Sequence, residues 1–151
     1  MKNIYVLPTD KPSRLSINCQ TNLLQLGLEN RMFHDDRNIY ITSDEEIKEG
    51  DWYINTFVSE RDQKPQTHTK NSQLINHKKD YRFKYCKKII LTTNQDLIQN
   101  GIQSIMDEFL EWFVNNPTCD NVGLKPWFNE ILSCCKSESE CSCNKKRIVL
   151  P

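Results

Sequence analysis

The sequence has no alanine and only four glycines among its 151 residues. Loops that cradle phosphate groups, such as the P-loop and the dinucleotide-binding fingerprint, need several glycines at fixed spacing, and neither pattern occurs. The G-x-S-x-G motif of serine hydrolases is also missing. Asn, Lys and Ile, which AT-rich codons encode, are abundant instead. The composition thus indicates a gene from an AT-rich genome and excludes these nucleotide-binding and hydrolase signatures.

Long hydrophobic runs are missing as well. Hydrophobic residues make up 37% of the chain, and the mean hydropathy is −0.68. No window approaches the roughly 18 apolar residues of a membrane-spanning helix. The opening segment, MKNIYVLPTDK, lacks the long apolar run of a signal peptide before its first proline. We therefore expect an intracellular protein with no membrane partner.

The charges of the chain balance. Lys and Arg total 20, and Asp and Glu also total 20. Without a global basic excess, any nucleic-acid site must be local. The length predicts a single domain over residues 1–151, because a chain of this size can bury about two-thirds of its unfolded surface around one core.

Three short segments show the composition and alternation of β-strands: residues 3–8, 38–42 and 51–58. The acidic turn SDEEIKEGD joins the last two, and Gly50 within it is free to take a positive φ. This unit is typical of a hairpin in a small sheet or barrel. Residues 9–22 are polar and are predicted as a loop.

The middle of the chain contains the strongest predicted strand. Before it, NLLQLGL fits either a short strand or a helical turn, and the polar residues 59–80 are predicted as a flexible loop of unusual length. Residues 81–92 then alternate with a period of two. One predicted face carries Tyr81, Phe83, Tyr85, Lys87, Ile89 and Leu91, and the other carries Arg82, Lys84, Cys86, Lys88, Ile90 and Thr92.

Two helices are predicted after this strand. The first is short, capped by Asn94 and closed by Gly101. The second spans residues 104–115 with Ser104 as its N-cap. Its apolar stripe consists of Ile105, Met106, Phe109, Leu110, Trp112 and Phe113. The closing KRIVLP is predicted as a strand that flanks the sheet beside the opening strand. The predicted fold is α+β: a small, mostly antiparallel sheet or open barrel that packs against one amphipathic helix.

Seven cysteines make an odd count, and without a secretion signal a disulfide framework is not expected. Four of them lie in the polar segment 133–144, as Cys134, Cys135, Cys141 and Cys143. Their pattern is a poorer zinc site than the C-x-x-C pairs that zinc usually binds. We predict reduced thiols and no metal site in this segment, with zinc binding as the minor alternative.

Three other patterns have a functional interpretation beside a simpler one. The triplet HDD at residues 34–36 places an imidazole beside two carboxylates, but in a polar loop it is more often a solvated turn. Arg61 and His68 have a spacing that some ribonucleases use, but Pro65 argues against the helix that would align them. The acidic turn is not spaced like an EF-hand, so it is also interpreted as solvated, although it could mimic phosphate toward a basic partner.

The basic stretch at residues 78–88 is the main candidate site. Its cations are Lys78, Lys79, Arg82, Lys84, Lys87 and Lys88. Phosphate groups bind such cations, and interleaved aromatic side chains can stack on bases. The period of two, however, places the aromatic side chains opposite Arg82 and Lys84, whereas a stacking platform needs both on one face. We therefore predict mainly a core strand, whose solvent-facing edge supplies a local basic patch for a partner or a nucleic acid.

Five stretches have a more specific pattern: VLPTDKPSRL, IYITSDEEIKEGDWYI, KKIILTTNQDLI followed by Gly101, EFLEWFVNNPTC and the terminal RIVLP. Together they resemble a family of small proteins that phages and mobile elements of Bacteroidota encode. The resemblance covers about two-fifths of the chain and does not extend to residues 59–80 or to the cysteine-rich segment. It implies a phage or prophage accessory protein in the host cytoplasm, and it supplies no catalytic motif.

From this resemblance and the absent catalytic signatures we expect a non-enzymatic protein without a cofactor. We expect it to bind and inhibit a host defence component, namely a CRISPR nuclease effector with its RNA, because separate acidic and basic patches would suit such a nucleoprotein. The alternative is a small RNA- or DNA-binding protein that uses the basic residues 78–88. A third hypothesis is a minor metalloprotein that uses the cysteine-rich segment.

Overall fold

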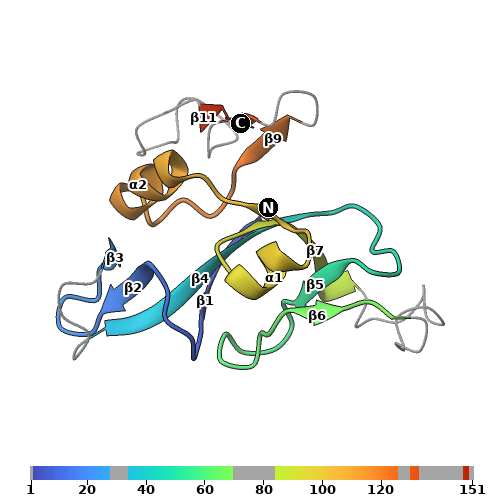
Figure 1. Cartoon of the computed structure of the whole chain (residues 1–151), viewed down its shortest axis with the longest axis horizontal. Helices are drawn as coiled ribbons and strands as arrows, with labels where there is room; N and C mark the ends of the chain where they lie inside the picture. The colour runs from blue at the N-terminus through green and yellow to red at the C-terminus, as the bar shows by residue number, and fades with distance from the viewer. Residues whose placement is uncertain (1, 28–33, 70–83, 126–129, 133–147, 150–151) are drawn as a thin grey trace.

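The computed structural model describes residues 2–27, 34–69, 84–125, 130–132 and 148–149 (Figure 1). Strands β3, β2, β4, β7, β5 and β6 lie side by side in that order in one open sheet, where β1 also pairs with β4 and β8 with β7. Its pairs are antiparallel except β7–β8. The prediction of a mostly antiparallel, open sheet is confirmed. The elements of this part are β1 (Ile4–Pro8), β2 (Leu15–Asn18), β3 (Leu24–Leu26), β4 (His34–Ser43), β5 (Trp52–Asn55), β6 (Gln66–Thr67), β7 (Cys86–Thr92), α1 (Gln95–Gln99), β8 (Gln103–Ser104) and α2 (Asp107–Asn115).

A second, antiparallel sheet has the order β11–β10–β9. Its strands are β9 (Gly123–Lys125), β10 (Glu130–Leu132) and β11 (Ile148–Val149). The prediction that the first and last strands flank one sheet is wrong. Ile4 and Val6 of β1 pair with Ile41 and Ile39 of β4, which match their apolar alternation, whereas β11 pairs with β10.

β4 is the central strand, and β1 occupies one of its edges. β2 and β7 share the other edge: β2 pairs with residues 34–37 and β7 with residues 40–43. Ile39 lies between these two ladders, where its N–H donates to Thr93 Oγ1 (2.9 Å) and its C=O accepts from the Thr93 N–H (3.1 Å). β2 and β7 therefore diverge at Asn38 and leave a fork in the sheet.

A β-bulge in β7 directs its apolar residues to both faces of the sheet. Ile41 pairs with Leu91 and Thr42 pairs with Ile89, so Ile90 has no partner on β4. Leu91 and Ile89 consequently belong to different cores. The prediction that these two residues share one face is wrong, because the extra residue interrupts the strict alternation.

The two faces of the sheet have separate hydrophobic cores. The larger core contains Ile4, Leu15, Ile39, Ile41, Leu91, Ile105, Phe109, Leu110, Trp112, Phe113, Cys119 and Val122. The smaller core contains Tyr5, Leu7, Tyr40, Ile54, Ile89 and Leu97. Neighbouring residues of β1 and β4 alternate between the two cores, as the pleat of a strand requires. The buried stripe of α2 belongs to the larger core, and α1 contributes Leu97 to the smaller one.

The two helices begin in different ways. Asn94 caps α1 by accepting bonds from backbone N–H groups of the first turn, and Gly101 takes a positive φ (100°) beyond its end, as predicted. α2 begins after Met106, whose side chain makes no capping bond. The prediction of Ser104 as N-cap is wrong, because Gln103–Ser104 is extended and pairs with β7 as β8.

Among the described residues, no helix is both long and apolar enough to cross a membrane.

The predicted hairpin of residues 38–42 and 51–58 is also wrong. β7 lies between β4 and β5 and pairs with both. The acidic turn therefore spans β7, and its carboxylates meet Lys87 and Lys88 of that strand. Attraction between opposite charges and the apolar end of β7 explain this order, which neighbouring segments alone do not reveal.

Several segments predicted as loops contain strands. β2 lies within residues 9–22, because Leu15 is buried between its neighbours, and β6 lies within residues 59–80. The HDD triplet is part of β4 and pairs with β2, so its interpretation as a solvated turn is wrong. NLLQLGL forms β3. Residues 70–80 of the predicted loop and the cysteine-rich segment 133–144 lie outside the described residues.

Candidate functional site

The predicted basic site lies only partly within the described residues. Three of its cations are outside them: Lys78, Lys79 and Arg82. Lys84 is exposed and lies in a short helical turn that precedes β7. Lys87 and Lys88 follow on β7 itself. Within the described part, the strand thus begins at Cys86, and Lys84 is separated from the lysines of the ladder.

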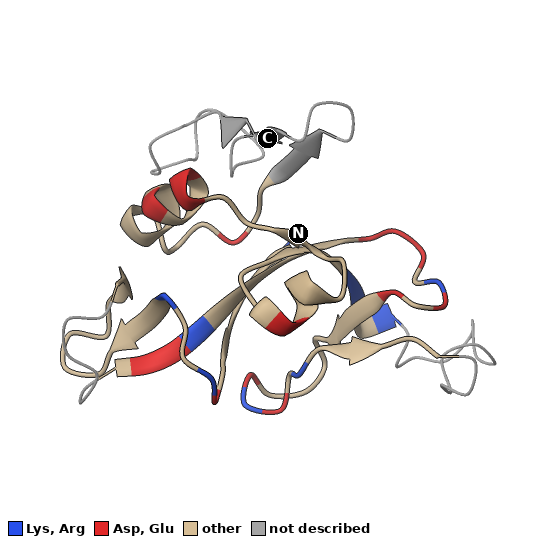
Figure 2. Cartoon of the chain, viewed as in Figure 1, with Lys and Arg blue, Asp and Glu red and all other residues tan. Residues whose placement is uncertain are grey.

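The acidic turn folds against the two lysines of β7. Lys87 Nζ pairs with the Asp44 carboxylate. Lys88 Nζ lies 3.5 Å from Glu45 Oε2 and 3.3 Å from Asp51 Oδ2. The lysine side chains are only 20% and 23% exposed, so their charges act mainly on these carboxylates. The expectation of separate acidic and basic patches is wrong for these five residues, whose cations and carboxylates pair with one another. We call them the mixed charged surface, and Figure 2 shows the acidic residues of the turn between β4 and β5 in red.

An exposed aromatic side chain lies near this mixed charged surface. Phe57 is 56% exposed, and its ring centroid is 5.1 Å from that of Tyr85. The Tyr85 C=O accepts bonds from both the N–H and the Oγ1 of Thr56 (2.8 Å each), which joins the ends of β5 and β7. Lys84 Nζ lies 6.0 Å from the Tyr85 ring centroid. We call Phe57, Tyr85 and Lys84 the aromatic–lysine cluster.

This cluster corrects the sequence interpretation of Tyr85, whereas Tyr81 and Phe83 lie outside the described residues. Tyr85 is half-buried at the surface and shares that surface with Lys84, instead of lying in a core opposite the cations. The alternation fails because the chain turns at Lys84 before β7 begins. Sequence analysis missed Phe57, since an apolar residue near the end of a predicted strand fits a core equally well.

Burial keeps two ionisable groups of this region protonated. It raises the pKa of the Cys86 thiol and that of the Tyr53 hydroxyl, and the charge of Cys86 raises the latter further. The Tyr53 hydroxyl hydrogen-bonds with Gln66 Oε1 (2.9 Å). A thiol with a raised pKa is a poor nucleophile at neutral pH. The polar groups of β5 and β7 therefore serve packing and pairing.

The two histidines within the described residues lie on different elements, His34 on β4 and His68 directly after β6. His34 Nδ1 lies 3.0 Å from Ser16 Oγ, across the β2–β4 ladder. His68 is buried and its backbone bonds to Asp51, and His77 lies outside the described residues. Within the part that the structure describes, no group of three or more His, Cys, Asp or Glu side chains could hold a metal ion. Cys134, Cys135, Cys141 and Cys143 lie outside that part.

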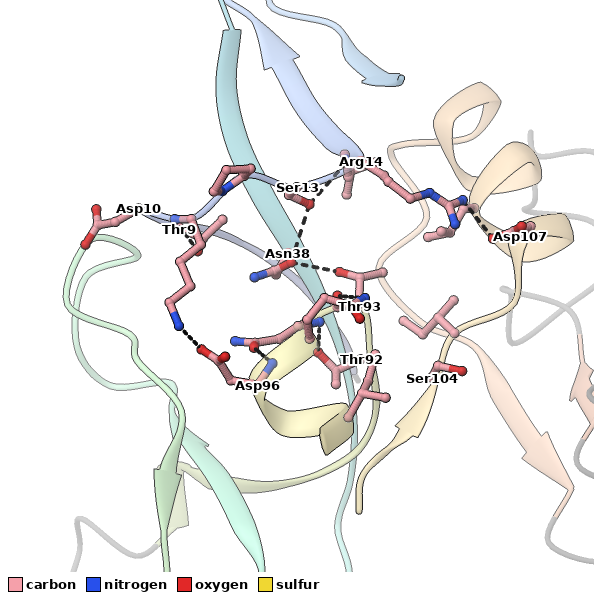
Figure 3. Close-up of a pocket in the computed structure, with 18 residues that line it drawn as sticks. Thr9, Asp10, Ser13, Arg14, Asn38, Thr92, Thr93, Asp96, Ser104 and Asp107 are labelled. Atoms are coloured by element: carbon pink, nitrogen blue, oxygen red, sulfur yellow. Dashed lines mark hydrogen bonds and ion pairs between the residues drawn. The ribbon is translucent and has the colours of Figure 1, made fainter. Parts of the chain in front are cut away.

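A cleft of about 900 Å³ opens at the fork between β2 and β7 (Figure 3). Asn38, which is 6% exposed, lies at its centre, and its Oδ1 accepts bonds from Ser13 Oγ (3.5 Å) and Thr93 Oγ1 (3.2 Å). Thr92 Oγ1 donates to the Ile39 C=O (2.9 Å) beside it. These side chains supply the bonds that a continuous ladder would otherwise make.

Two ion pairs hold the β1–β2 loop over this cleft. Lys11 pairs with Asp96 of α1. Arg14 Nη2 lies 2.7 Å from Asp107 Oδ1 at the start of α2. All four side chains are more than half exposed, so each pair contributes little stability. Because the polar groups of the cleft bond mainly to one another, we assign them the structural role of closing the fork.

A second cleft, of about 1050 Å³, lies between β3 and α2. Its lining consists of Leu23, Leu24, Gln25, Leu26, Gly27, His34, Glu111, Val114, Asn115 and Pro117. Leu23 is 57% exposed here. The lining of this cleft is about equally apolar and polar. Its described residues include one carboxylate and no Lys or Arg, which suits a segment with apolar and cationic side chains rather than a phosphate.

Comparison with protein-family models, with curated protein sequences and with solved structures finds no match for this chain.

Proposed function

We propose that this chain is a non-enzymatic, phage-encoded accessory protein that binds and inhibits a host defence component, a CRISPR nuclease effector with its RNA. The observation that carries the proposal is the aromatic–lysine cluster beside the mixed charged surface. Protein interfaces are enriched in aromatic residues at their centre and in charged residues at their rim. The stretches that resemble proteins of phages and mobile elements support the phage origin.

Each part of this surface has a role toward a nucleoprotein. Phe57 supplies an apolar anchor that a partner pocket can bury. Lys84 and the predicted cations before it contact RNA phosphates. Glu45 and its neighbours on the acidic turn face basic side chains of a nucleic-acid channel. Inhibition then follows from occupation of the channel and requires no catalytic residue.

Affinity capture from a Bacteroidota host that carries its defence systems tests this proposal. We expect the tagged protein to recover one stoichiometric nucleoprotein and to reduce target cleavage by it in vitro. Phe57→Ala should weaken both effects about tenfold or more, the usual size for an interface anchor. Glu60→Ala, a change at an exposed position in the following turn, is the matched control. Recovery of no stoichiometric host protein would contradict the proposal.

A second candidate function is direct binding of single-stranded RNA or DNA. The placement of Lys84 on the same surface as Tyr85 and Phe57 favours it, because base stacking and phosphate contact then use one face. Binding of a labelled RNA should fall with salt and be lost in an Arg82→Glu, Lys84→Glu variant. Lys88→Gln should matter less, since carboxylates already pair with Lys88. RNA binding that survives the double change would rule out this function.

A further inference from the structure

Within the part of the chain that the structure describes, β3 is an edge strand whose outer N–H and C=O groups have no backbone partner. The Leu23 C=O accepts a bond from the Asn18 N–H (2.9 Å) across the β2–β3 ladder. The alternation of an antiparallel ladder therefore turns the N–H and C=O groups of Leu24 and Leu26 away from β2. None of the backbone hydrogen bonds among the described residues reaches these groups. An unpaired edge of this kind is a template for another strand.

The cleft beside this edge provides space for the side chains of such a strand. α2 forms its far wall through Val114, and Pro117 follows at the end of the helix. Leu24 and Leu26 direct their side chains toward the larger core, so they form an apolar base along β3. A strand paired with β3 would place every second side chain against this apolar base.

The charge of α2 bears on the same cleft-facing side chains of the strand, because α2 lies on the face of the sheet to which Leu24 and Leu26 point. The helix carries Asp107, Glu108 and Glu111 and no Lys or Arg, and Figure 2 shows only acidic residues on its ribbon. Asp107 already pairs with Arg14. Glu111 lines the cleft and is exposed, whereas Glu108 is exposed but does not line it. A cationic side chain in the cleft would meet Glu111 directly.

We propose that the groove between β3 and α2 binds an extended segment of a partner protein in which every second residue faces the cleft, and this cleft-facing set combines apolar residues with one Lys or Arg. The segment adds to β3 as a further strand, bonds to the backbone of Leu24 and Leu26, and places Lys or Arg beside Glu111. A second copy of this chain fits less well. Its β3 offers LQL without a cation, and a symmetric pair would bring two acidic α2 helices together.

This inference rests on one part of the proposed function, namely that the chain binds a protein partner. Its test needs no host protein, so it can fail while capture of a host nucleoprotein succeeds, and the reverse also holds. Capture depends on Phe57, which lies at the far end of the sheet order from β3.

Binding of a short, end-blocked peptide to the full chain tests the pairing. Every second position of the peptide is valine, except for one central lysine in the same set, and serine occupies the other positions. Two N-methylated versions serve as matched probes, one methylated at every valine and at the lysine, and one methylated at every serine. Only one set of N–H groups faces β3, so one version should bind like the parent and the other about tenfold more weakly. Equal affinities of the two versions, or no binding of the parent peptide, would overturn the proposal.

Two helix variants test the charge. Glu111→Lys should weaken binding of this peptide about threefold to fivefold and improve binding of a version with glutamate in place of the lysine. Glu108→Lys, the matched control, should change either affinity less than about twofold. Equal effects of the two variants would remove Glu111 from the site. A concentration-dependent dimer in sedimentation that excludes the peptide would overturn the proposal by assigning the groove to a second copy.

Discussion

The two helices are held against opposite faces of the sheet by different interactions. α1 has five residues, one buried side chain and an Asn94 cap. α2 has nine residues, four buried side chains and no side-chain cap. Helices of this length are marginal in water on their own, so each depends on support from outside the helix. Directional polar bonds hold α1, and apolar burial holds α2.

The polar support of α1 comes from particular atoms. Asn94 Nδ2 donates to the Tyr40 hydroxyl (3.0 Å) while Asn94 Oδ1 caps the helix. Lys11 adds an exposed ion pair to Asp96. The support of α2 is instead apolar packing. The ring centroid of Phe109 lies 5.6 Å from that of Trp112 and 5.7 Å from that of Phe113. Damage to α1 should therefore depend on hydrogen-bonding chemistry, and damage to α2 on side-chain size.

The largest effect should come from Phe109→Ala. This side chain is fully buried in the larger core, so we expect the free energy of unfolding to fall by about 3–5 kcal/mol. Phe57→Ala, an equal truncation at an exposed position, should cost less than about 1 kcal/mol. Urea unfolding followed by circular dichroism measures both. Similar losses in the free energy of unfolding for the two variants would contradict the conclusion that apolar burial holds α2.

Asn94→Ala should have the next largest effect. It removes the cap of α1 and the bond to Tyr40, so we expect a loss of about 1–2 kcal/mol in the free energy of unfolding. The control is Gln95→Ala at the adjacent, exposed position, which should change little. Hydrogen exchange of the α1 amides should rise in Asn94→Ala alone. Unchanged exchange would mean that Leu97 burial holds the helix.

A smaller effect is expected where neither helix contacts the sheet. Lys88→Gln leaves Glu45 and Asp51 without their cation, and we expect a loss of about 0.5–1 kcal/mol at low ionic strength. Raising the salt concentration to about 1 M should shrink this loss, because the Debye length falls to about 3 Å. Lys84→Gln, outside these ion pairs, is the control. A loss that is independent of salt would assign the effect to packing of the lysine stem.

The last prediction concerns Tyr40, on the face of the sheet that carries α1. The effect of this residue on stability should be the smallest at neutral pH and should become measurable in alkali. Burial raises its pKa above the ordinary 10.0, and Asp96 adds to this while bonds from Asn94 and Asn38 oppose it. The unfolded chain then loses this proton first, so the contribution is complete below pH 10 and disappears as pH rises through the folded pKa. Tyr40→Phe should make the alkaline slope of stability shallower, as thermal melts from pH 8 to pH 11 would measure. An unchanged slope would contradict this.

Local patterns predicted much of what the two helices contain. The buried residues of α2 follow from their spacing, although Ile105 and Met106 of the predicted stripe precede the helix. Asn94 and Gly101 follow from cap chemistry. Ser104 fails as a cap because its backbone finds a partner strand, β7, which no local pattern indicates. β2 escaped prediction because only four residues form it, Leu15–Asn18, and the segment around it is polar.

The sequence likewise predicted one part of the candidate site and missed another. The cations at Lys84, Lys87 and Lys88 are evident in the sequence as a basic stretch. Their pairing is not, since Asp44 is 43 residues from Lys87 along the chain and reaches it only because β7 lies between β4 and β5. The exposure of Phe57 also depends on neighbours that the sequence does not identify.

The sequence by itself determined which segments alternate, where α1 is capped and which residues of α2 are apolar, because these depend on contacts within a few residues. The tertiary structure decided the strand order, the bulge at Ile90, the fork at Asn38 and the open edge of β3. Those features arise from competition among distant segments for the same hydrogen-bonding edges and apolar faces. Each segment's own pattern fits several partners, and only the assembled sheet selects one.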